Sequence, residues 1–115
     1  MQSLEDIEAW LGQALPEPYR SFLQRHPQSQ WAADDRTLVY GRDAIVERND
    51  TYESRQYCPG HIMVADDSGG VTFVLSLKDG SIHAVDMGAM TPDCFDAVAP
   101  GFAEWAEAGF RSTGD

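Results

Sequence analysis

The chain has 115 residues, 43% of them hydrophobic, which suits one ordinary domain with a real core and argues against disorder. Its 19 acidic and 8 basic residues give a formal net charge of −11. Such a charge disfavours nucleic acid and anionic membranes as partners, and it favours solubility or a basic partner.

The N-terminal part of the chain is predicted to form a pair of short helices. Ser3 suits the N-cap of the first helix, and Gly12 weakens the end of that helix. Pro16 suits the first position of the second helix, and Pro27 stops it. Apolar side chains follow helical spacing in both helices: Leu4, Ile7, Trp10, Leu11 and Ala14, then Leu15, Tyr19, Phe22, Leu23 and His26.

The first residues are acidic and no long apolar run follows them. We therefore expect neither a signal peptide nor a transmembrane span. The expected location is the cytoplasm, where the two cysteines, Cys58 and Cys94, would stay reduced.

The middle of the chain is predicted to be less regular. Residues 28–36 are mostly polar and indicate a loop, whereas residues 37–40 have the β-branched and aromatic character of a short strand. Asp43 can cap a short helix over residues 44–48. Residues 49–57 indicate a loop or an irregular helical turn.

A β-hairpin is the central predicted element, with strands over residues 61–65 and 71–77. Pro59 and Gly60 open it, and Gly69 and Gly70 can supply the positive φ angles of its turn. Alternation predicts that one face of the second strand carries these apolar residues: Val71, Phe73, Leu75 and Leu77. The turn at Gly80 then predicts a third strand over residues 81–86.

The C-terminal part is predicted to be a connection over residues 87–96, followed by a helix. Pro100 would start this helix, Phe102 and Trp105 would share its apolar face, and Gly109 would lie at its end. The predicted fold is a single α+β domain over residues 1–115. It has an antiparallel meander sheet, with the N-terminal helical pair and the C-terminal helix packed against it.

Three sets of residues suit either a chemical site or a structural role. Asp66, Asp67, His61 and His83 are the nearest approach to a metal or acid–base site, but aspartate commonly caps turns, and we favour that role. Neither cysteine lies in a nucleophile signature, which favours inert thiols. The Gly69–Gly70 pair lacks the sequence of a phosphate-binding loop.

Residues 15–23, with the sequence LPEPYRSFL, resemble the opening motif of the SUKH superfamily. This superfamily includes fungal cell-wall-assembly regulators of the Smi/Knr type and bacterial immunity proteins. The resemblance continues through residues 40–57, especially 47–49 and 52, and through residues 59–70, 82–86 and 98–105, in the family's order. Ala65 and Ser68 replace usual glycines, and Pro100–Gly101 replaces a polar residue and a serine. The structural signature carried over comprises Pro16, Tyr19, Phe22, Asn49, Pro59, Gly60, Gly69, Gly70, Phe102 and Trp105.

The resemblance implies a non-catalytic protein-binding domain without a cofactor. Bacterial relatives bind a cognate toxin, often a nuclease, and block it, so we expect an immunity protein. The alternatives are a regulatory or scaffold module that binds an endogenous protein, and an enzyme or metal protein that uses Asp66, Asp67 and His61. The oligomeric state stays open.

The expected partner is a basic toxin domain, because residues 61–115 carry nine acidic and two basic residues, a net charge of −7. The hairpin turns and the following connection could form an acidic surface that steers such a partner. Trp10 and Trp105 are expected in the core, whereas Trp31 lies in a polar segment and is either an interface anchor or packed over the helices. The candidate partner-binding residues are Trp31, Asp34, Asp35, Asp66, Asp67, Asp79, Asp86 and Asp93.

Overall fold

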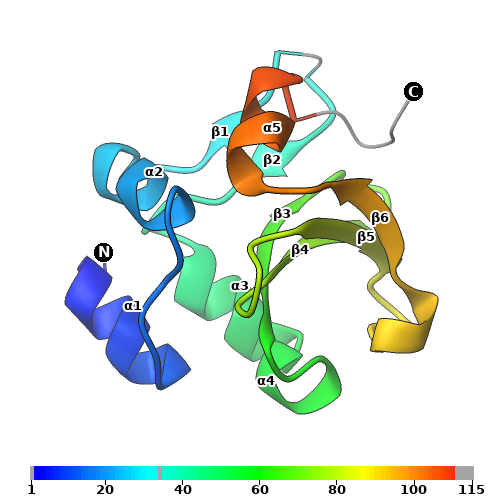
Figure 1. The fold of residues 1–115 in the computed structure, drawn as a ribbon, viewed down its shortest axis with the longest axis horizontal. Helices are drawn as coiled ribbons and strands as arrows, with labels where there is room; N and C mark the ends of the chain where they lie inside the picture. The colour runs from blue at the N-terminus through cyan, green and yellow to red at the C-terminus, as the bar shows by residue number, and fades with distance from the viewer. Residues whose placement is uncertain (1, 34, 111–115) are drawn as a thin grey trace.

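Six antiparallel strands form one meander sheet in the computed structural model, which describes residues 2–33 and 35–110 (Figure 1). Each strand pairs with the next along the chain, in the order β1-β2-β3-β4-β5-β6. Their bounds are β1 (Gln30–Trp31), β2 (Leu38–Val39), β3 (His61–Asp66), β4 (Val71–Ser76), β5 (Ile82–Asp86) and β6 (Asp96–Ala99). The predicted α+β fold with an antiparallel meander is confirmed.

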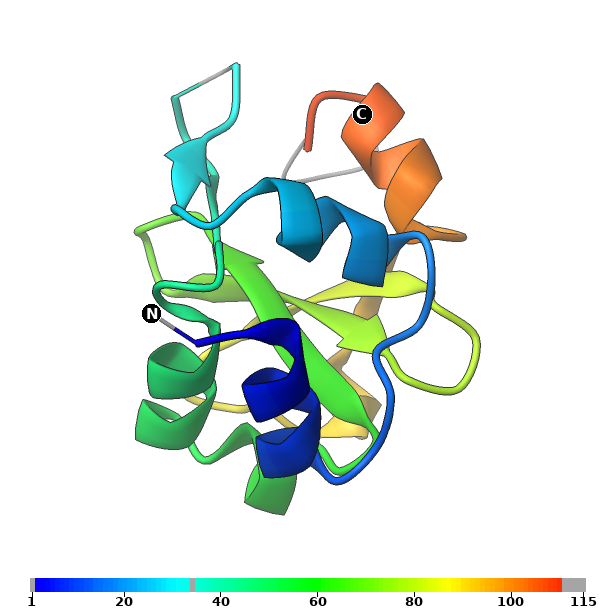
Figure 2. The same cartoon turned by 90° about the vertical axis from the view of Figure 1, so that its left-hand side faces the viewer.

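The helices lie against this sheet, and α1 crosses in front of the strands in Figure 2. They are α1 (Leu4–Leu11), α2 (Tyr19–Arg25), α3 (Ile45–Thr51), α4 (Ser54–Tyr57) and α5 (Phe102–Glu107), with a short 3-10 helix η1 (Pro92–Cys94). Ser3 caps α1 as predicted, since its hydroxyl accepts a hydrogen bond from the Asp6 N–H at 3.1 Å. Gly12 ends α1 in the left-handed conformation, with φ of 87°.

An aromatic cluster joins α2, α5 and the sheet. Tyr19 and Phe22 of α2 each lie 4.9 Å, centroid to centroid, from Phe102 of α5. The ring of Trp105, also on α5, lies 5.1 Å from that of Phe73 on β4. These five side chains are buried. The predicted packing of the N-terminal helices and the C-terminal helix on the sheet is therefore confirmed.

The central strands are buried on both faces. All residues of β3 and β4 beyond the first are buried, so the face of β4 that carries Thr72 and Ser76 is buried as well. Thr72 tolerates this burial because its hydroxyl donates a hydrogen bond to the Ala65 carbonyl at 2.8 Å.

Several predicted boundaries were wrong in the N-terminal half. Helix α2 begins at Tyr19 and not at Pro16, because a residue that precedes proline, here Glu17 before Pro18, is disfavoured in the helical region. The predicted loop over residues 28–36 contains β1. Asp43 does not cap α3. Its carboxylate instead accepts hydrogen bonds from the N–H and hydroxyl of Ser29 at 2.9 and 2.8 Å.

Other differences concern helix ends and one edge strand. The segment over residues 49–57 holds the end of α3 and all of α4. Strand β6 was missed, and α5 begins at Phe102 with Gly101 at its N-cap. Trp10 is half-buried outside the core, where the Arg55 guanidinium lies 4.0 Å from its ring centroid. None of the helices in the described part of the chain is long and apolar enough to cross a membrane.

Candidate functional site

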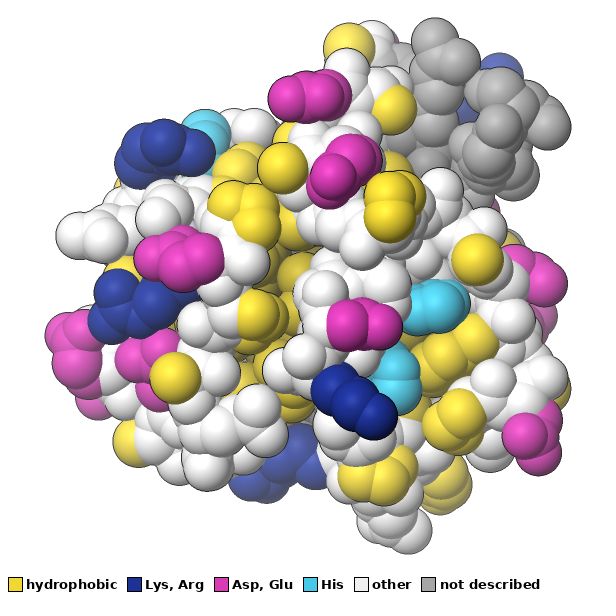
Figure 3. All heavy atoms as spheres, viewed as in Figure 1, with side chains coloured by type: hydrophobic (Ala, Val, Ile, Leu, Met, Phe, Trp, Pro, Cys, Tyr) yellow, Lys and Arg dark blue, Asp and Glu magenta, His cyan; other side chains and the backbone are white. Residues whose placement is uncertain are grey.

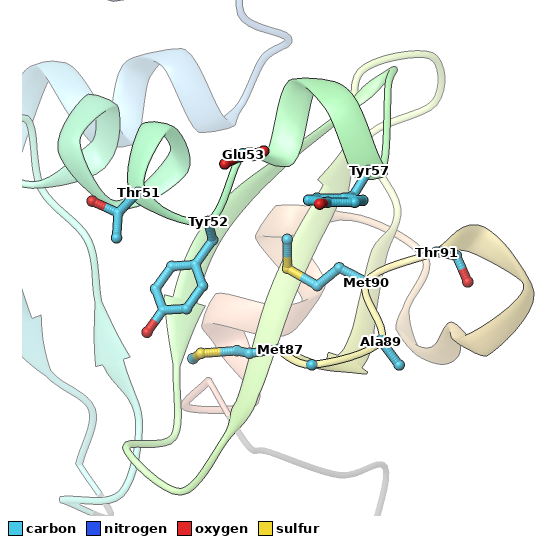
Figure 4. Close-up of a pocket in the computed structure, with 9 residues that line it drawn as sticks. Thr51, Tyr52, Glu53, Tyr57, Met87, Ala89, Met90 and Thr91 are labelled. Carbon is cyan, nitrogen blue, oxygen red and sulfur yellow. The ribbon is translucent and has the colours of Figure 1, made fainter.

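A groove of about 430 Å³ opens between the corner that joins α3 to α4 and the segment that follows β5 (Figure 4). Met90 projects between Tyr52 and Tyr57 in this view. The lining residues are Thr51, Tyr52, Glu53, Tyr57, Met87, Gly88, Ala89, Met90 and Thr91. The groove thus offers aromatic rings and thioethers together with one carboxylate.

Asn49 holds the corner between α3 and α4 in place. Its buried side chain donates to the carbonyls of Ile45 at 2.7 Å and Met63 at 3.0 Å. Its carboxamide oxygen accepts from the Met63 N–H at 2.7 Å and from the Ser54 hydroxyl at 2.6 Å. Because β2 pairs with β3 only at Ala65 and Asp66, the Asn49 carboxamide takes the place of a neighbouring strand at Met63.

The ion pair between Arg48 and Asp66 packs against Tyr52, one of the residues that line the groove. The Arg48 guanidinium lies 5.4 Å from the Tyr52 ring centroid and 5.8 Å from that of Tyr40. It donates a hydrogen bond to the buried Asp66 carboxylate at 3.1 Å. The Tyr40 hydroxyl donates to the same carboxylate oxygen. Burial, reinforced by the Asp66 charge, raises the pKa of Tyr40, which therefore stays a donor.

The opposite wall follows β5 and is organised by Asp86. The Asp86 carboxylate accepts from the Gly88 N–H at 2.7 Å, and its carbonyl accepts from the Ala89 N–H at 3.0 Å. The Met87 N–H donates to the Gly70 carbonyl at 2.8 Å, which ties this wall to the turn of the central hairpin. Met90 is buried, whereas Tyr57 on the facing wall is 50% exposed.

The two aspartates of the hairpin turn have different surroundings. Asp67 caps the turn as predicted, since its carboxylate accepts from the Gly69 N–H at 2.7 Å and the Val71 N–H at 3.0 Å. Asp66 is 3% exposed and paired with Arg48, so its inclusion in an acidic surface was wrong. Asp66 belongs to β3, which is buried on both faces, whereas Asp67 lies in the turn beyond the strand.

The other acidic residues of the predicted surface lie at both ends of the sheet. Asp67 and Asp86 lie at one end of the sheet, where Val71 pairs with Asp86, whereas Asp79 lies at the other end because consecutive turns of a meander alternate. Asp35 lies in the segment between β1 and β2, three residues before Leu38, which pairs with Asp66. On the face drawn in Figure 3 the acidic side chains are scattered.

The other predicted partner-binding residues are spread over the molecule. Trp31 on β1 is 52% exposed, and Asp93 is exposed on η1. Asp34 lies outside the described residues. Binding of a partner at any of these residues stays a prediction.

The residues of the metal or acid–base alternative are not brought together. His61 begins β3 and Asp66 ends it, so they lie at opposite ends of the strand. The rings of His61 and His83 pack on Phe95, with centroid distances of 4.8 and 5.6 Å, and burial lowers the pKa of His61. Within residues 2–33 and 35–110, no three or more His, Cys, Asp or Glu side chains are grouped to hold a metal ion.

The two thiols differ in environment. Cys58 is fully buried, and this burial raises its pKa to about 11, so the thiol is inert as expected. Cys94 is exposed, and the Thr91 hydroxyl lies 3.7 Å from its sulfur.

Sequence reasoning missed the groove itself. Tyr52 and Tyr57 fell in a segment predicted to be a loop or an irregular helical turn, and Met87 and Met90 fell in a predicted connection. The signal was an aromatic pair in a polar segment, since such rings outside an apolar stripe often serve contacts with other molecules.

The sequence matches the family described as SMI1 / KNR4 family (SUKH-1) over residues 2–108. The match spans both walls of the groove and all of the described strands and helices up to Glu107. No curated protein matches the chain.

Proposed function

Because this chain belongs to the SMI1 / KNR4 family (SUKH-1), we propose that it is a non-catalytic protein-binding domain that acts as an immunity protein. It binds a basic toxin domain, such as a nuclease, and blocks the toxin's active surface. The observation that carries the proposal is the groove, which presents tyrosine rings and methionine thioethers beside an acidic residue.

The chemistry of this groove suits contact with a protein. Tyrosine supplies a large contact area with little loss of side-chain entropy, and methionine adapts its shape to an incoming side chain. Aromatic residues and methionine are also enriched where proteins meet. The net charge of −11 would speed the approach of a basic partner over longer distances.

Co-expression with a toxin domain encoded beside this chain tests the proposal. We expect growth to be restored by the wild-type chain and by the control Glu107→Gln, which changes an exposed residue on α5. Replacement of an exposed groove residue, as in Tyr57→Ala, should weaken protection. A toxin that stays equally lethal with and without this chain contradicts the immunity role.

Affinity capture from the native host separates this role from the regulatory alternative. Recovery of a basic toxin supports the proposal, whereas reproducible recovery of an endogenous housekeeping protein instead favours a regulatory module. With the captured toxin, the association rate should fall steeply as salt rises, because screening removes the long-range attraction. A rate independent of salt would remove charge steering from the mechanism.

A further inference from the structure

The geometry of the groove points to a more specific ligand, and we propose that it binds an arginine side chain presented by the partner protein. This inference rests on the proposed function, because it names the chemical group by which a basic partner is held. The groove's volume of about 430 Å³ lies at the lower end of the roughly 300–1,000 Å³ of ligand pockets, which suits one long side chain and its neighbouring backbone.

The aromatic walls supply the surfaces on which a guanidinium stacks. The face or edge of Tyr57 is accessible, since this residue is 50% exposed. Tyr52 is half-buried and its position is fixed by the Arg48–Asp66 ion pair behind it. A fixed ring binds at a smaller entropic cost than a mobile one. Tyr52 and Tyr57 lie on either side of Met90, so a side chain that lies over Met90 can contact both rings (Figure 4).

The wall of the groove that follows β5 suits the alkyl part of an arginine. Met87 and Met90 offer flexible, polarisable thioethers that can follow the three methylene groups of such a side chain. Arginine characteristically lays its stem on apolar surface and keeps its charged head at a polar rim. Glu53, which lies between Tyr52 and Tyr57 in the sequence, lines the groove, and its carboxylate can pair with the guanidinium.

The charges around the groove favour a cation. Its lining includes Glu53 and no Lys, Arg or His, and the exposed residues Asp50 and Asp86 adjoin the lining segments along the chain. Two nearby cations already have partners, and one of them, Arg48, also lies over the Tyr52 ring. Arg48 is paired with Asp66, and Arg55 stacks on the Trp10 ring and donates to the Trp10 carbonyl at 2.8 Å.

Arginine fits this arrangement better than the other side chains of a basic protein. Its planar guanidinium stacks on aromatic faces and forms paired hydrogen bonds with carboxylates, whereas the lysine ammonium is a strongly hydrated point charge. A purely apolar side chain would leave the Glu53 carboxylate partly desolvated without a partner, which is unfavourable.

Amide chemical-shift mapping of the full chain by NMR tests the inference without the toxin. The probe is an N-acetylated, C-amidated Gly-Ala-Arg-Ala-Gly peptide, compared with matched peptides that carry citrulline or lysine in place of arginine. We expect saturable shifts that cluster at residues 51–57 and 87–91. The citrulline peptide, which keeps the shape and loses the charge, should bind at least about fivefold more weakly, with the lysine peptide between the two.

Matched variants locate the interaction. Glu53→Gln and Tyr57→Ala should each lower the affinity for the arginine peptide about three- to tenfold. Glu107→Gln, which removes an exposed carboxylate from α5, and Trp31→Ala, which removes the exposed ring on β1, should leave its affinity unchanged. Preserved amide spectra outside the groove would show that the variants fold.

Equal binding of the arginine and citrulline peptides, shifts centred outside the groove, or no saturable shift would each overturn the inference. These outcomes are separable from failure of the immunity role. Protection against a toxin without arginine binding refutes the ligand alone, whereas arginine binding in the groove without protection refutes the immunity role alone.

Discussion

Replacing Asn49 by alanine should destabilise the protein strongly, because this one side chain holds α3, α4 and β3 together. The substitution leaves the N–H and carbonyl of Met63 and the hydroxyl of Ser54 without their present partner. Asn49 is 0% exposed, so water does not reach these groups without rearrangement.

The magnitude follows from the number of groups affected. A buried polar group that loses its partner costs about 1–3 kcal/mol, and the Ser54 hydroxyl can rotate toward another acceptor. We therefore expect the free energy of unfolding to fall by about 3–5 kcal/mol, out of the ~5–15 kcal/mol of an ordinary domain. The Tm should fall by roughly 10–20 °C.

Urea unfolding, followed by tryptophan fluorescence and circular dichroism, measures this effect. Ser54→Ala removes one of the four hydrogen bonds and should cost about 1 kcal/mol. Asp50→Ala changes an exposed residue on the same helix and should stay within about 0.5 kcal/mol of the wild type. If Asn49→Ala lowered the free energy of unfolding no more than Asp50→Ala does, the role assigned to Asn49 as a substitute for a neighbouring strand would be wrong.

Two further predictions concern titratable groups. In the folded protein Cys94 should react quickly with a thiol reagent and Cys58 only on unfolding. Burial raises the Cys58 pKa from 9.0 to about 11. The contribution of the buried thiol to stability is therefore complete below pH 9 and should be lost as the pH rises toward 11. Unfolding of the wild type and of Cys58→Ala at alkaline pH checks this prediction. Glu8 accepts hydrogen bonds from the Arg20 side chain at 3.1 Å and from the Leu15 N–H at 2.7 Å. These bonds lower the pKa of Glu8 below its ordinary value of 4.5. Its stabilising effect should therefore be present above pH 4.5 and be lost as the pH falls below that value. The stabilities of the wild type and of Glu8→Gln should then converge in acid. A difference in stability that stays constant with pH would contradict this assignment.

Local chemistry made much of the fold predictable. The capping interaction of Ser3 and the left-handed Gly12 depend on neighbours a few residues away, and both bounds of α1 follow from them. The central hairpin is likewise encoded by its turn, where the Asp67 carboxylate binds the N–H groups of Gly69 and Val71. Such elements can be predicted because their determinants lie within one turn of chain.

Elements that depend on distant partners were harder to predict. Strand β6 has four residues, two of them exposed, so it carries no clear alternation and exists through its pairing with β5. The α4 segment offers no apolar stripe, and its place is set by the bond from Ser54 to Asn49 and by the contact of Arg55 with Trp10.

The sequence by itself determined the helical pair, the meander and the character of the turns, because hydrophobic spacing and turn residues act locally. It also determined the strongly acidic charge and the resemblance to a family. Only the tertiary structure decided that Asp66 is buried, since its carboxylate accepts hydrogen bonds from Arg48 and Tyr40, far away in sequence, as well as from the nearby Ser68 N–H. The groove, too, is a tertiary feature, because packing brings together residues 51–57 and 87–91, which the central hairpin and β5 separate along the chain.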